Sequence, residues 1–401
     1  MRPSILIPSL AATICLITSS VCAQKSNVAF AITGQTKGDV SWNAVRQIDL
    51  STGAEIKSIY TPKDRPASFD ALSGNRTIAT TAPTETFVAA TAYDGKTNRL
   101  FFTPMHSNEL RYFDLNQGTS SVYYVQNAPL KTFEEKSEGD VLTRMCFGAD
   151  GYGYALTNDA NHLIRFTSGS KIIISDLGSV KDGAENEDIS IRNLCTSWGG
   201  DMIADAMGNL YVISMKKNVF KINPQTLVAD FMGAISNIPA DYTVNGAAVD
   251  ASGKVVVSSA SRTDYYYSVN LSTLQATAMP KKDQQVYNAS DLASGHLAYE
   301  DVSDAKTNPS INVTGNSLVS VYPNPVPNKT IQVSFNKVSS GNQTIQISDV
   351  AGHKLLSKVV NVSTQATAQV NLPASVKSGV YIIKVTDANG KVSYSGKIVV
   401  Y

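Results

Sequence analysis

A strand–turn–strand motif recurs along most of the chain, and it constrains the fold more than any other feature of the sequence. In each copy an apolar strand runs into an Asp-to-Gly turn, and a second apolar strand follows. Another strand pair comes after each copy, as at Leu163–Phe166. The turn aspartates of the four clear copies, spaced 56, 55 and 45 residues apart, are Asp94, Asp150, Asp205 and Asp250. Repeats of roughly 40–50 residues with four antiparallel strands are typical of β-propeller blades, which bury their faces by stacking on neighbours.

The two ends of the repeat region predict a closed ring. A degenerate fifth copy, Ser290–Tyr299, supplies only two strands. Val45–Gly53 and Glu55–Tyr60 match the third and fourth strands of a unit. We therefore expect one blade to be assembled from both ends of the region, which gives five units. A sixth blade stays open, because Val28–Thr33 predicts a further strand and residues 61–90 are not assigned. The competing fold is an open pair of β-sandwiches.

The charge balance excludes some classes of partner. The chain has 34 Lys and Arg against 33 Asp and Glu, a net charge of +1, and no concentrated basic run. Such a chain lacks the electrostatic footprint of nucleic-acid binding or of attraction to anionic lipid. Hydrophobic residues make up 43% of the 401 residues, which is ample material for buried cores. We expect an all-β protein with no nucleic-acid partner and no transmembrane span.

Short strands resume after a polar linker at residues 304–317. Apolar and polar residues alternate strictly in Thr330–Phe335 and in Thr344–Ser348. Seven short strands in about 85 residues, with Gly or Asn turns between them, predict a small immunoglobulin-like β-sandwich. We expect four segments, namely a signal peptide at 1–23, a propeller-like domain at 24–303, the linker at 304–317 and the sandwich at 318–401.

Four motifs occur in order within this last domain. They are Val321–Val326, Ile347–Gly352, Gly379–Val385 and Gly396–Val400. With these motifs the domain resembles the C-terminal sorting domain of type IX secretion cargo of the Bacteroidetes, over about a fifth of the chain. The candidate sorting residues are Tyr322, Pro323, Asn324, Pro325, Gly352, Gly379, Tyr381, Lys384 and Lys397. An ordinary immunoglobulin-like adhesion or spacer module is the alternative.

The resemblance implies an address outside the cell. It implies that the domain is recognised by the type IX outer-membrane translocon and is then usually removed by the associated sortase. The rest of the protein would be released or attached to surface polysaccharide. The resemblance therefore implies secretion across the outer membrane, with an extracellular or surface-attached product.

The first residues predict a secretory signal peptide. Arg2 supplies the positive start. The apolar stretch Ile5–Thr18 is shorter than the roughly 20 residues needed to span a bilayer, which argues against a membrane anchor. Small residues at Val21 and Ala23 predict cleavage between Ala23 and Gln24, by signal peptidase after passage through the Sec translocon.

Two of the four cysteines lie in the expected signal peptide, so Cys146 and Cys195 remain in the mature chain. An oxidising compartment would let them form a disulfide, but one pair does not make a disulfide scaffold. Because buried free thiols are common, the pairing stays open.

Chemical motifs are scarce in the body. It contains no Gly-x-Ser-x-Gly elbow, Walker loop, dinucleotide fingerprint or Cys/His metal spacing. The repeated aspartates are expected to cap turn N–H groups. One loop, residues 182–188, holds four carboxylates and an amide, whose oxygens suit Ca²⁺. Its candidate ligands are Asp182, Glu185, Glu187 and Asp188. A solvated acidic loop is the alternative, and no other cofactor is expected.

Two functions stay open. The first is a surface protein that binds an extracellular ligand through loops at one end of the ring, such as Leu177–Ser190, or through aromatic side chains. The aromatic candidates, which sheet packing would also explain, are Tyr123, Tyr124, Tyr265, Tyr266, Tyr267 and Trp198. The second is a metal-dependent propeller hydrolase or lactonase, with a channel metal near Glu109, Asn158 and Asn245. We favour binding, because no motif for chemistry is visible.

Overall fold

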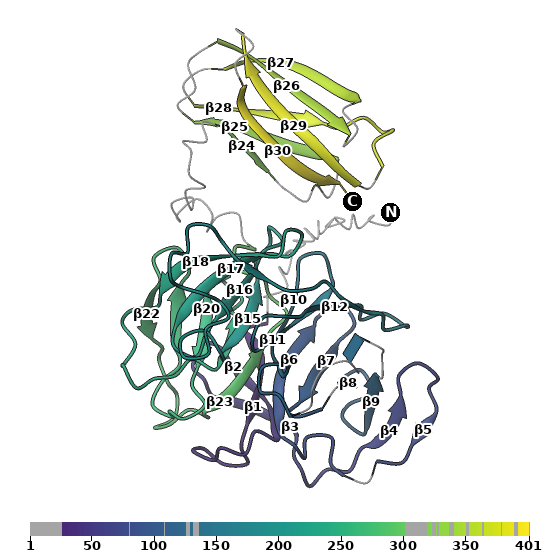
Figure 1. Ribbon diagram of the computed structural model, residues 1–401, viewed down its shortest axis with the longest axis vertical. Coiled ribbons are helices and arrows are strands. Elements are labelled where there is room, and N and C mark those ends of the chain that lie inside the picture. Colours follow the sequence, from purple (N-terminus) through teal and green to yellow (C-terminus); the bar gives the residue numbers. More distant parts are fainter. Residues whose placement is uncertain are drawn as a thin grey trace, which may run out of the picture.

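Apolar residues between tight turns form mainly antiparallel sheets in a computed structural model of the chain (Figure 1). The structure describes residues 26–79, 81–107, 109–125, 129–130, 136–300, 319–322, 326, 329–336, 341–349, 353–362, 365–377, 379–388 and 392–400. Within these ranges five sheets lie between residues 28 and 293, and two lie in the C-terminal domain.

Each of the five sheets of the body contains four antiparallel strands, and two of the sheets have additional short strands at one edge. Within each sheet, every strand is hydrogen-bonded to the next one named below. The closing sheet contains, in that order, β23 (Ala289–Ala293), β1 (Val28–Thr33), β2 (Ala44–Asp49) and β3 (Glu55–Tyr60). The second sheet contains β6 (Val88–Asp94), β7 (Arg99–Pro104), β8 (Leu110–Asp114) and β9 (Ser121–Val125), with β4 (Ala67–Asp70) and β5 (Arg76–Thr77) added beyond β9. The third contains β10 (Leu142–Phe147), β11 (Gly153–Thr157), β12 (Leu163–Phe166) and β13 (Ile174–Asp176).

The remaining two sheets of the body follow the same pattern. The fourth sheet contains β15 (Asp201–Ala204), β16 (Leu210–Ile213), β17 (Asn218–Asn223) and β18 (Val228–Ala234), with the short parallel strand β14 (Lys181–Asp182) beyond β18. The fifth contains β19 (Gly246–Val249), β20 (Val255–Ser258), β21 (Tyr267–Asn270) and β22 (Gln275–Ala278).

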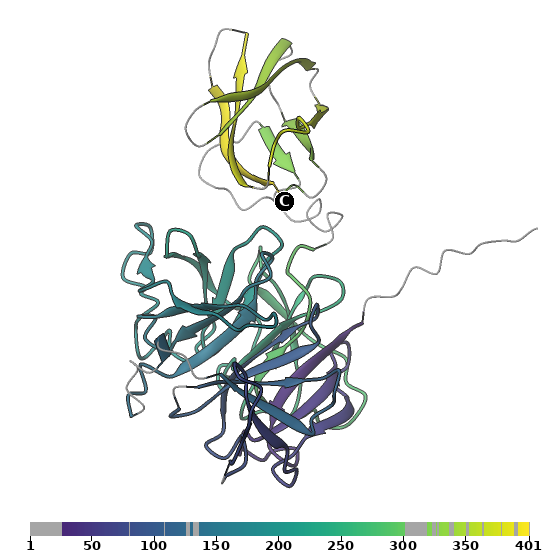
Figure 2. The ribbon, with the colours of Figure 1, turned by 90° about the vertical axis from the view of Figure 1, so that its right-hand side faces the viewer.

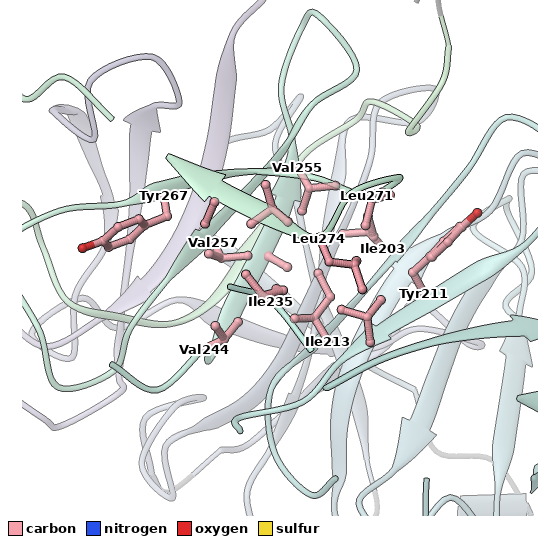
Figure 3. Packing of buried hydrophobic residues seen from close by; sticks show 14 of the residues in the cluster. Ile203, Tyr211, Ile213, Ile235, Val244, Val255, Val257, Tyr267, Leu271 and Leu274 are labelled. Carbon is pink, nitrogen blue, oxygen red and sulfur yellow. The ribbon is translucent and has the colours of Figure 1, made fainter. Parts of the chain in front are cut away.

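These five sheets form a closed, propeller-like ring. The innermost strands β6, β10, β15, β19 and β23 contact one another in sequence, and β23 contacts β6 again. Hydrophobic clusters fill all five spaces between adjacent sheets. Between the fourth and fifth sheets, Ile203 and Tyr211 pack in one cluster with Val255 and Leu274 (Figure 3). A buried aliphatic side chain contributes about 1.5–3 kcal/mol, so each sheet is stabilised on both faces by its neighbours.

The closing sheet joins both ends of the ring, as the sequence predicts, but with a different division of strands. β23 pairs antiparallel with β1, and Leu292 lies opposite Ala31. The C-terminal end of the ring supplies one strand instead of two, and Val28–Thr33 is the second strand of this sheet instead of part of a sixth unit. Part of the unassigned region 61–90 forms β4 and β5, of which β4 pairs parallel with β9.

Asp291 does not occupy a turn, although the degenerate fifth copy predicts one there. It lies inside β23, and its side chain is fully buried. Residues 294–300 form no second strand, and Ala298 makes an isolated bridge with Asp205 instead. The repeat pattern therefore finds the last strand of the ring but assigns its carboxylate to the wrong environment.

The C-terminal domain consists of two antiparallel sheets around a common core (Figure 2). The smaller sheet contains β24 (Val319–Tyr322), β25 (Thr330–Asn336) and β28 (Gln365–Asn371). The larger contains β27 (Lys354–Val362), β26 (Gly341–Asp349), β29 (Gly379–Asp387) and β30 (Val392–Val400). Ile331 and Val333 of the smaller sheet share the core with Ile345 and Ile383 of the larger, and all four are fully buried.

The candidate sorting residues are spread over three strands of this domain. Gly379, Tyr381 and Lys384 lie on β29, Tyr322 ends β24, and Lys397 belongs to β30. The other candidates, Pro323, Asn324, Pro325 and Gly352, lie outside the described residues, as do Ala23 and Gln24 of the expected cleavage site.

Candidate functional site

Three charged side chains are fully buried between the innermost strands: Arg144 of β10, Asp201 of β15 and Asp291 of β23. Asp201 Oδ2 accepts the backbone N–H of Ala247 in β19 at 2.6 Å and that of Leu292 in β23 at 3.3 Å. Hydrogen bonds to an ionised acceptor are stronger than neutral ones. One carboxylate therefore ties together the inner strands of three sheets.

Burial changes the ionisation of both carboxyl groups. Asp291 Oδ1 accepts the backbone N–H of Thr91 at 3.2 Å, whereas Oδ2 has no hydrogen-bond partner among the described residues. Burial and the nearby Asp201 raise the pKa of Asp291 well above its usual range. Burial also raises the pKa of Asp201, although its backbone donors and Arg144 oppose that shift. Because Asp201 has the donors and the cation, the pair favours a proton on Asp291.

Arg144 is held by backbone carbonyl groups. Its Nη2 donates to Ser197 at 2.6 Å, Nε to Gly199 at 3.1 Å and Nη1 to Thr157 at 3.2 Å. Burial lowers the pKa of the guanidinium to about 10, so the group stays charged at neutral pH. One feature of the sequence could have indicated this centre, namely a charged residue within a mostly apolar innermost strand. The repeated Asp-to-Gly turn pattern made such a residue look like part of a turn.

The axis of the ring leaves little space for a substrate. The cavity between the innermost strands measures about 20 Å³ and is lined in part by Met145, Cys146 and Met202. Among the residues that the structure describes, no group of three His, Cys, Asp or Glu side chains is arranged to hold a metal ion.

The three residues considered as channel ligands are engaged separately. Glu109 accepts a hydrogen bond from Arg111 of β8 at 2.7 Å. Asn158 Oδ1 accepts the N–H of Gly199 at 2.7 Å. Asn245 Oδ1 accepts a backbone N–H from the loop after β20 at 3.0 Å. Each side chain is thus hydrogen-bonded to a different neighbour. The buried charged residues between the innermost strands are Arg144, Asp201 and Asp291 instead.

The four repeated aspartates cap turns, as the sequence predicts. Asp205 Oδ1 accepts the N–H groups two and four residues ahead, at 2.9 and 2.8 Å. Asp94, Asp150 and Asp250 each accept the N–H two residues ahead. These bonds satisfy turn donors that the strand ladders leave unpaired.

The acidic loop folds against the fourth sheet without gathering its carboxylates. Asp182 accepts the N–H of Ile191 at 2.8 Å and the hydroxyl of Ser190 at 2.7 Å. The buried amide of Asn186 bonds the backbone of β18. All four carboxylates of the loop are exposed, namely Asp182, Glu185, Glu187 and Asp188. Calcium binding at this loop stays a prediction, and this arrangement does not favour it.

Residues 294–300, which we call the closing strap, cross the end of the ring at which the innermost strands terminate. The N–H of Ala298 donates to the last residue of β15 at 2.9 Å, and the Ser294 hydroxyl donates to the last residue of β19 at 2.7 Å. His296 Nε2 lies 2.7 Å from the carbonyl oxygen of Ser26. Since a carbonyl only accepts, that nitrogen carries a proton. The strap therefore links the fourth, fifth and closing sheets.

A pocket of about 440 Å³, which we call the strap slot, lies between the closing and second sheets beside the strap. Phe30 and Tyr93 line its inner part, with ring centroids 4.8 Å apart. At its outer part the Thr119 hydroxyl donates to the carbonyl of Ile59 at 3.0 Å. These two contacts join the sheets on either side of the slot, so its walls are fixed by the fold.

A second pocket, of about 580 Å³, lies between the closing and fifth sheets. Asp250, Lys254 and Asn270 line it, together with Tyr299 of the strap. Both pockets thus border the strap. The loop Leu177–Ser190, where the sequence predicts binding, leaves the third sheet at the opposite end, because the N–H of Leu177 bonds the first residue of β12.

Sheet packing accounts for most of the aromatic candidates. Tyr123 stacks on Tyr112 with centroids 4.8 Å apart, and Tyr266 is fully buried. Tyr267 meets Tyr242 edge-on at 4.9 Å. The remaining candidates, each beside a cation or held by a backbone hydrogen bond, are Tyr124, Tyr265 and Trp198. None of the six lines the strap slot.

Cys146 and Cys195 are both free, so the disulfide considered from the sequence is not formed. Cys195 is exposed in the loop before β15. Cys146 lies on β10 beside the small axial cavity, and burial raises the pKa of its thiol. The two thiols therefore differ in access.

Residues 320–401 match the family model described as a secretion system C-terminal sorting domain. This match confirms that the end of the chain is a sorting domain, and it indicates type IX export to the cell surface or the extracellular space. No helix in the described ranges has the length and apolarity needed to cross a bilayer.

Solved structures that match the chain share little sequence with it. PorZ, an essential surface component of the type IX secretion system of Porphyromonas gingivalis, is 14% identical with a TM-score of 0.32, over 93% of this chain and 51% of that chain. This chain thus spans about half the length of PorZ. Virginiamycin B lyase from Staphylococcus aureus is 10% identical with a TM-score of 0.33, over 94% and 96% of the two chains. A protein of unknown function from Bacteroides thetaiotaomicron is 11% identical with a TM-score of 0.39, over 67% and 70%. Similarities this low carry no functional argument, and no curated protein matches the chain.

Proposed function

We propose that the protein is a secreted or surface-attached binding protein, whose ring holds an extracellular ligand and whose C-terminal domain directs export by the type IX route. In this proposal each sheet of the ring is one blade of a five-bladed β-propeller, and the sorting domain is an immunoglobulin-like sandwich. The observation that carries the export part is the sorting-domain match at residues 320–401. The partners at that step are the outer-membrane translocon and its sortase, after the Sec translocon and signal peptidase.

The strap slot supports the binding part. Its volume of about 440 Å³ falls within the usual range for small-molecule sites, and its lining combines aromatic and aliphatic walls with a polar rim. The axis of the ring, where a hydrolase of this architecture would hold its metal, offers about 20 Å³. Arg144 and Asp201 there are already hydrogen-bonded to the backbone. Recognition at the strap end is therefore the function that the geometry supports best.

Removal of the last strand tests the export assignment. Deleting Gly396–Tyr401 removes the buried Ile398 and Val400 and leaves part of β29 as an unpaired edge. The truncated protein should accumulate in the periplasm, whereas the full chain should reach the surface or the medium. Val359→Thr, on the exposed face of β27, is the control and should be exported normally. Normal export of the truncated protein would contradict the assignment.

The expected signal cleavage has its own test. N-terminal sequencing of exported protein should return Gln24 as the first residue, because Val21 and Ala23 are the small residues before the cut. Recovery of Met1, or of a lipidated Cys22, would contradict a cleavable secretory signal.

Metal analysis and a ligand screen separate binding from hydrolysis. We expect the purified exported protein to carry no stoichiometric metal and to bind its ligand equally well after treatment with a chelator. A stoichiometric metal together with lactone or ester turnover that chelation abolishes would overturn the binding assignment in favour of the hydrolase.

A further inference from the structure

We propose that the strap slot takes a cyclic carboxylate, that is, a small ring or sugar unit that carries one carboxylate group. This inference rests on the proposed binding function and names the ligand class of the same site. Three features of the lining carry it: a fixed aromatic wall, one cation that has no acidic neighbour, and a size suited to a ring.

The aromatic wall is held in place by its neighbours. The Tyr93 hydroxyl donates to Asn98 Oδ1 at 2.9 Å, which fixes the orientation of the ring. Gly95 and Gly295 lie against the ring edge, since a Cβ atom on either would come within 3.8 and 3.4 Å of Tyr93 Cε1. A fixed aromatic ring beside two residues without side chains offers a flat apolar surface to a ligand ring.

The charges in the lining favour an anion. Lys57 of β3 lines the slot, is exposed and forms no ion pair with a described residue. No described Asp or Glu lines the slot. The second pocket differs in this respect, because both Asp250 and Lys254 line it. A cation without an acidic neighbour attracts a negative group. The strap slot therefore favours anionic ligands, whereas the second pocket, which has a charge of each sign, does not.

The number and kind of donors favour a carboxylate over a phosphate. His296 is already engaged, since Nε2 donates to Ser26 and Nδ1 lies 3.5 Å from Glu300. Lys57 therefore stands alone as a free cationic donor of the slot, and no described Arg lines it. Phosphate sites usually combine several donors, through an Arg fork or a row of backbone N–H groups. One ammonium group matches one carboxylate.

Matched acid and neutral probes separate the contribution of the ring from that of the charge. Benzoate and benzamide form one pair, and glucuronate and glucose form the other. Binding to the exported full-length protein is measured by calorimetry and by saturation-transfer NMR. The acid of at least one pair should bind about fivefold more tightly than its neutral partner, as expected for one exposed cation. Added salt should reduce this ratio, because it screens exposed charges.

Three variants locate the effect. Lys57→Met should bring the ratio of acid to neutral affinity close to one while the neutral probe still binds. Lys254→Met, in the second pocket, is the matched control and should leave the ratio unchanged. Tyr93→Leu should weaken acid and neutral probes alike, and a thermal melt shows whether this variant is folded.

The outcomes distinguish this inference from the proposed function. Tighter binding of glucuronate assigns an acidic sugar, and tighter binding of benzoate assigns an aromatic acid; both support a cyclic carboxylate. Equal affinity for acid and neutral probes, an unchanged ratio in Lys57→Met, or no binding by any of the four probes overturns it. Binding of a neutral glycan or a peptide that neither Lys57→Met nor Tyr93→Leu weakens would overturn this ligand class but leave the binding function standing.

Discussion

Asp291 and Thr91 are 200 residues apart in the sequence, yet Oδ1 of Asp291 accepts the backbone N–H of Thr91 at 3.2 Å. This bond joins the last strand of the ring, β23, to the inner strand β6 of the second sheet. The other oxygen of the same carboxyl group is buried without a described partner, close to Asp201. The closure of the ring thus includes a carboxyl group that is best accommodated in its neutral form.

Replacing Asp291 with Asn should make the stability of the protein less dependent on pH. The raised pKa means that the folded state holds this proton more tightly than the unfolded chain. The stabilisation is therefore complete below the unfolded pKa of about 3.9 and is lost as pH rises through the folded pKa. We expect the unfolding midpoint of the unaltered protein to fall more steeply above about pH 4 than that of Asp291→Asn.

Scanning calorimetry across that pH range measures this difference. Asp188→Asn, in the exposed acidic loop, is the matched control and should follow the unaltered protein. Parallel curves for Asp291→Asn and the unaltered protein would mean that the buried carboxyl group is ionised in the fold.

Arg144→Met should destabilise the protein by about 3–5 kcal/mol, the usual cost of removing one partner of a buried charged network. The change leaves carbonyl groups such as that of Ser197 without a donor, and it removes the cation near Asp201. Urea unfolding followed by intrinsic fluorescence gives the free energy. Lys216→Met, at an exposed position, should change the stability by less than about 0.5 kcal/mol. A similarly small loss for Arg144→Met would show that the network is not a stabilising element.

Gly200→Ala should prevent stable closure of the fourth sheet onto its neighbours. Gly200 has a left-handed φ of 82°, and a Cβ atom there would lie 1.9 Å from the carbonyl oxygen of Ile213. Gly208 has a similar φ of 87° but nothing within 4 Å, so Gly208→Ala should cost only about 1–2 kcal/mol of backbone strain. Comparing the two melts isolates the steric clash. Equal losses of stability would contradict it.

Thiol labelling should distinguish the two cysteines of the mature chain. Cys195 is exposed and should react with a disulfide reagent in the folded protein. Cys146 should react slowly, because burial raises the pKa of its thiol and the thiolate is the reactive form. Reaction of both in denaturant but of Cys195 alone in buffer is the expected result. Loss of both thiols in the exported protein would instead indicate a disulfide.

Local patterns in the sequence predicted the local structure of the ring. The turn at Asp205 could be predicted, because an Asp carboxylate commonly accepts the backbone N–H two residues ahead of it. The strands on either side could be predicted from their apolar residues. The pairing of β2 with β3 in the closing sheet could also be predicted, because the two strands are adjacent in the sequence and match the third and fourth strands of one repeat unit. The sequence predicts seven strands in the sorting domain, and seven lie among its described residues. Of the predicted ranges, Thr330–Phe335 lies within β25 and Thr344–Ser348 within β26.

The centre and the strap slot could not be predicted, because they depend on contacts between distant segments. Asp291 stands where the repeat places a turn, and only the packing of β23 between β19 and β6 shows that it is buried. Lys57 follows the pattern of an ordinary surface residue on β3. Its place opposite Tyr93 depends on how two sheets meet across the ring. No sequence pattern predicts that Gly295 lies against the aromatic ring of Tyr93.

The division of the closing sheet sets the order in which the body can fold. β1, β2 and β3 lie at the start of the body, but their fourth strand, β23, comes after the other four sheets in the chain. Until Ala289–Ala293 is available, the inner side of β1 has an unpaired edge, which can pair with another chain. Closure is therefore a late, long-range step, and contacts of this kind slow folding. A chain halted before residue 293 would expose this edge, so incomplete chains are expected to be more prone to association than the closed ring.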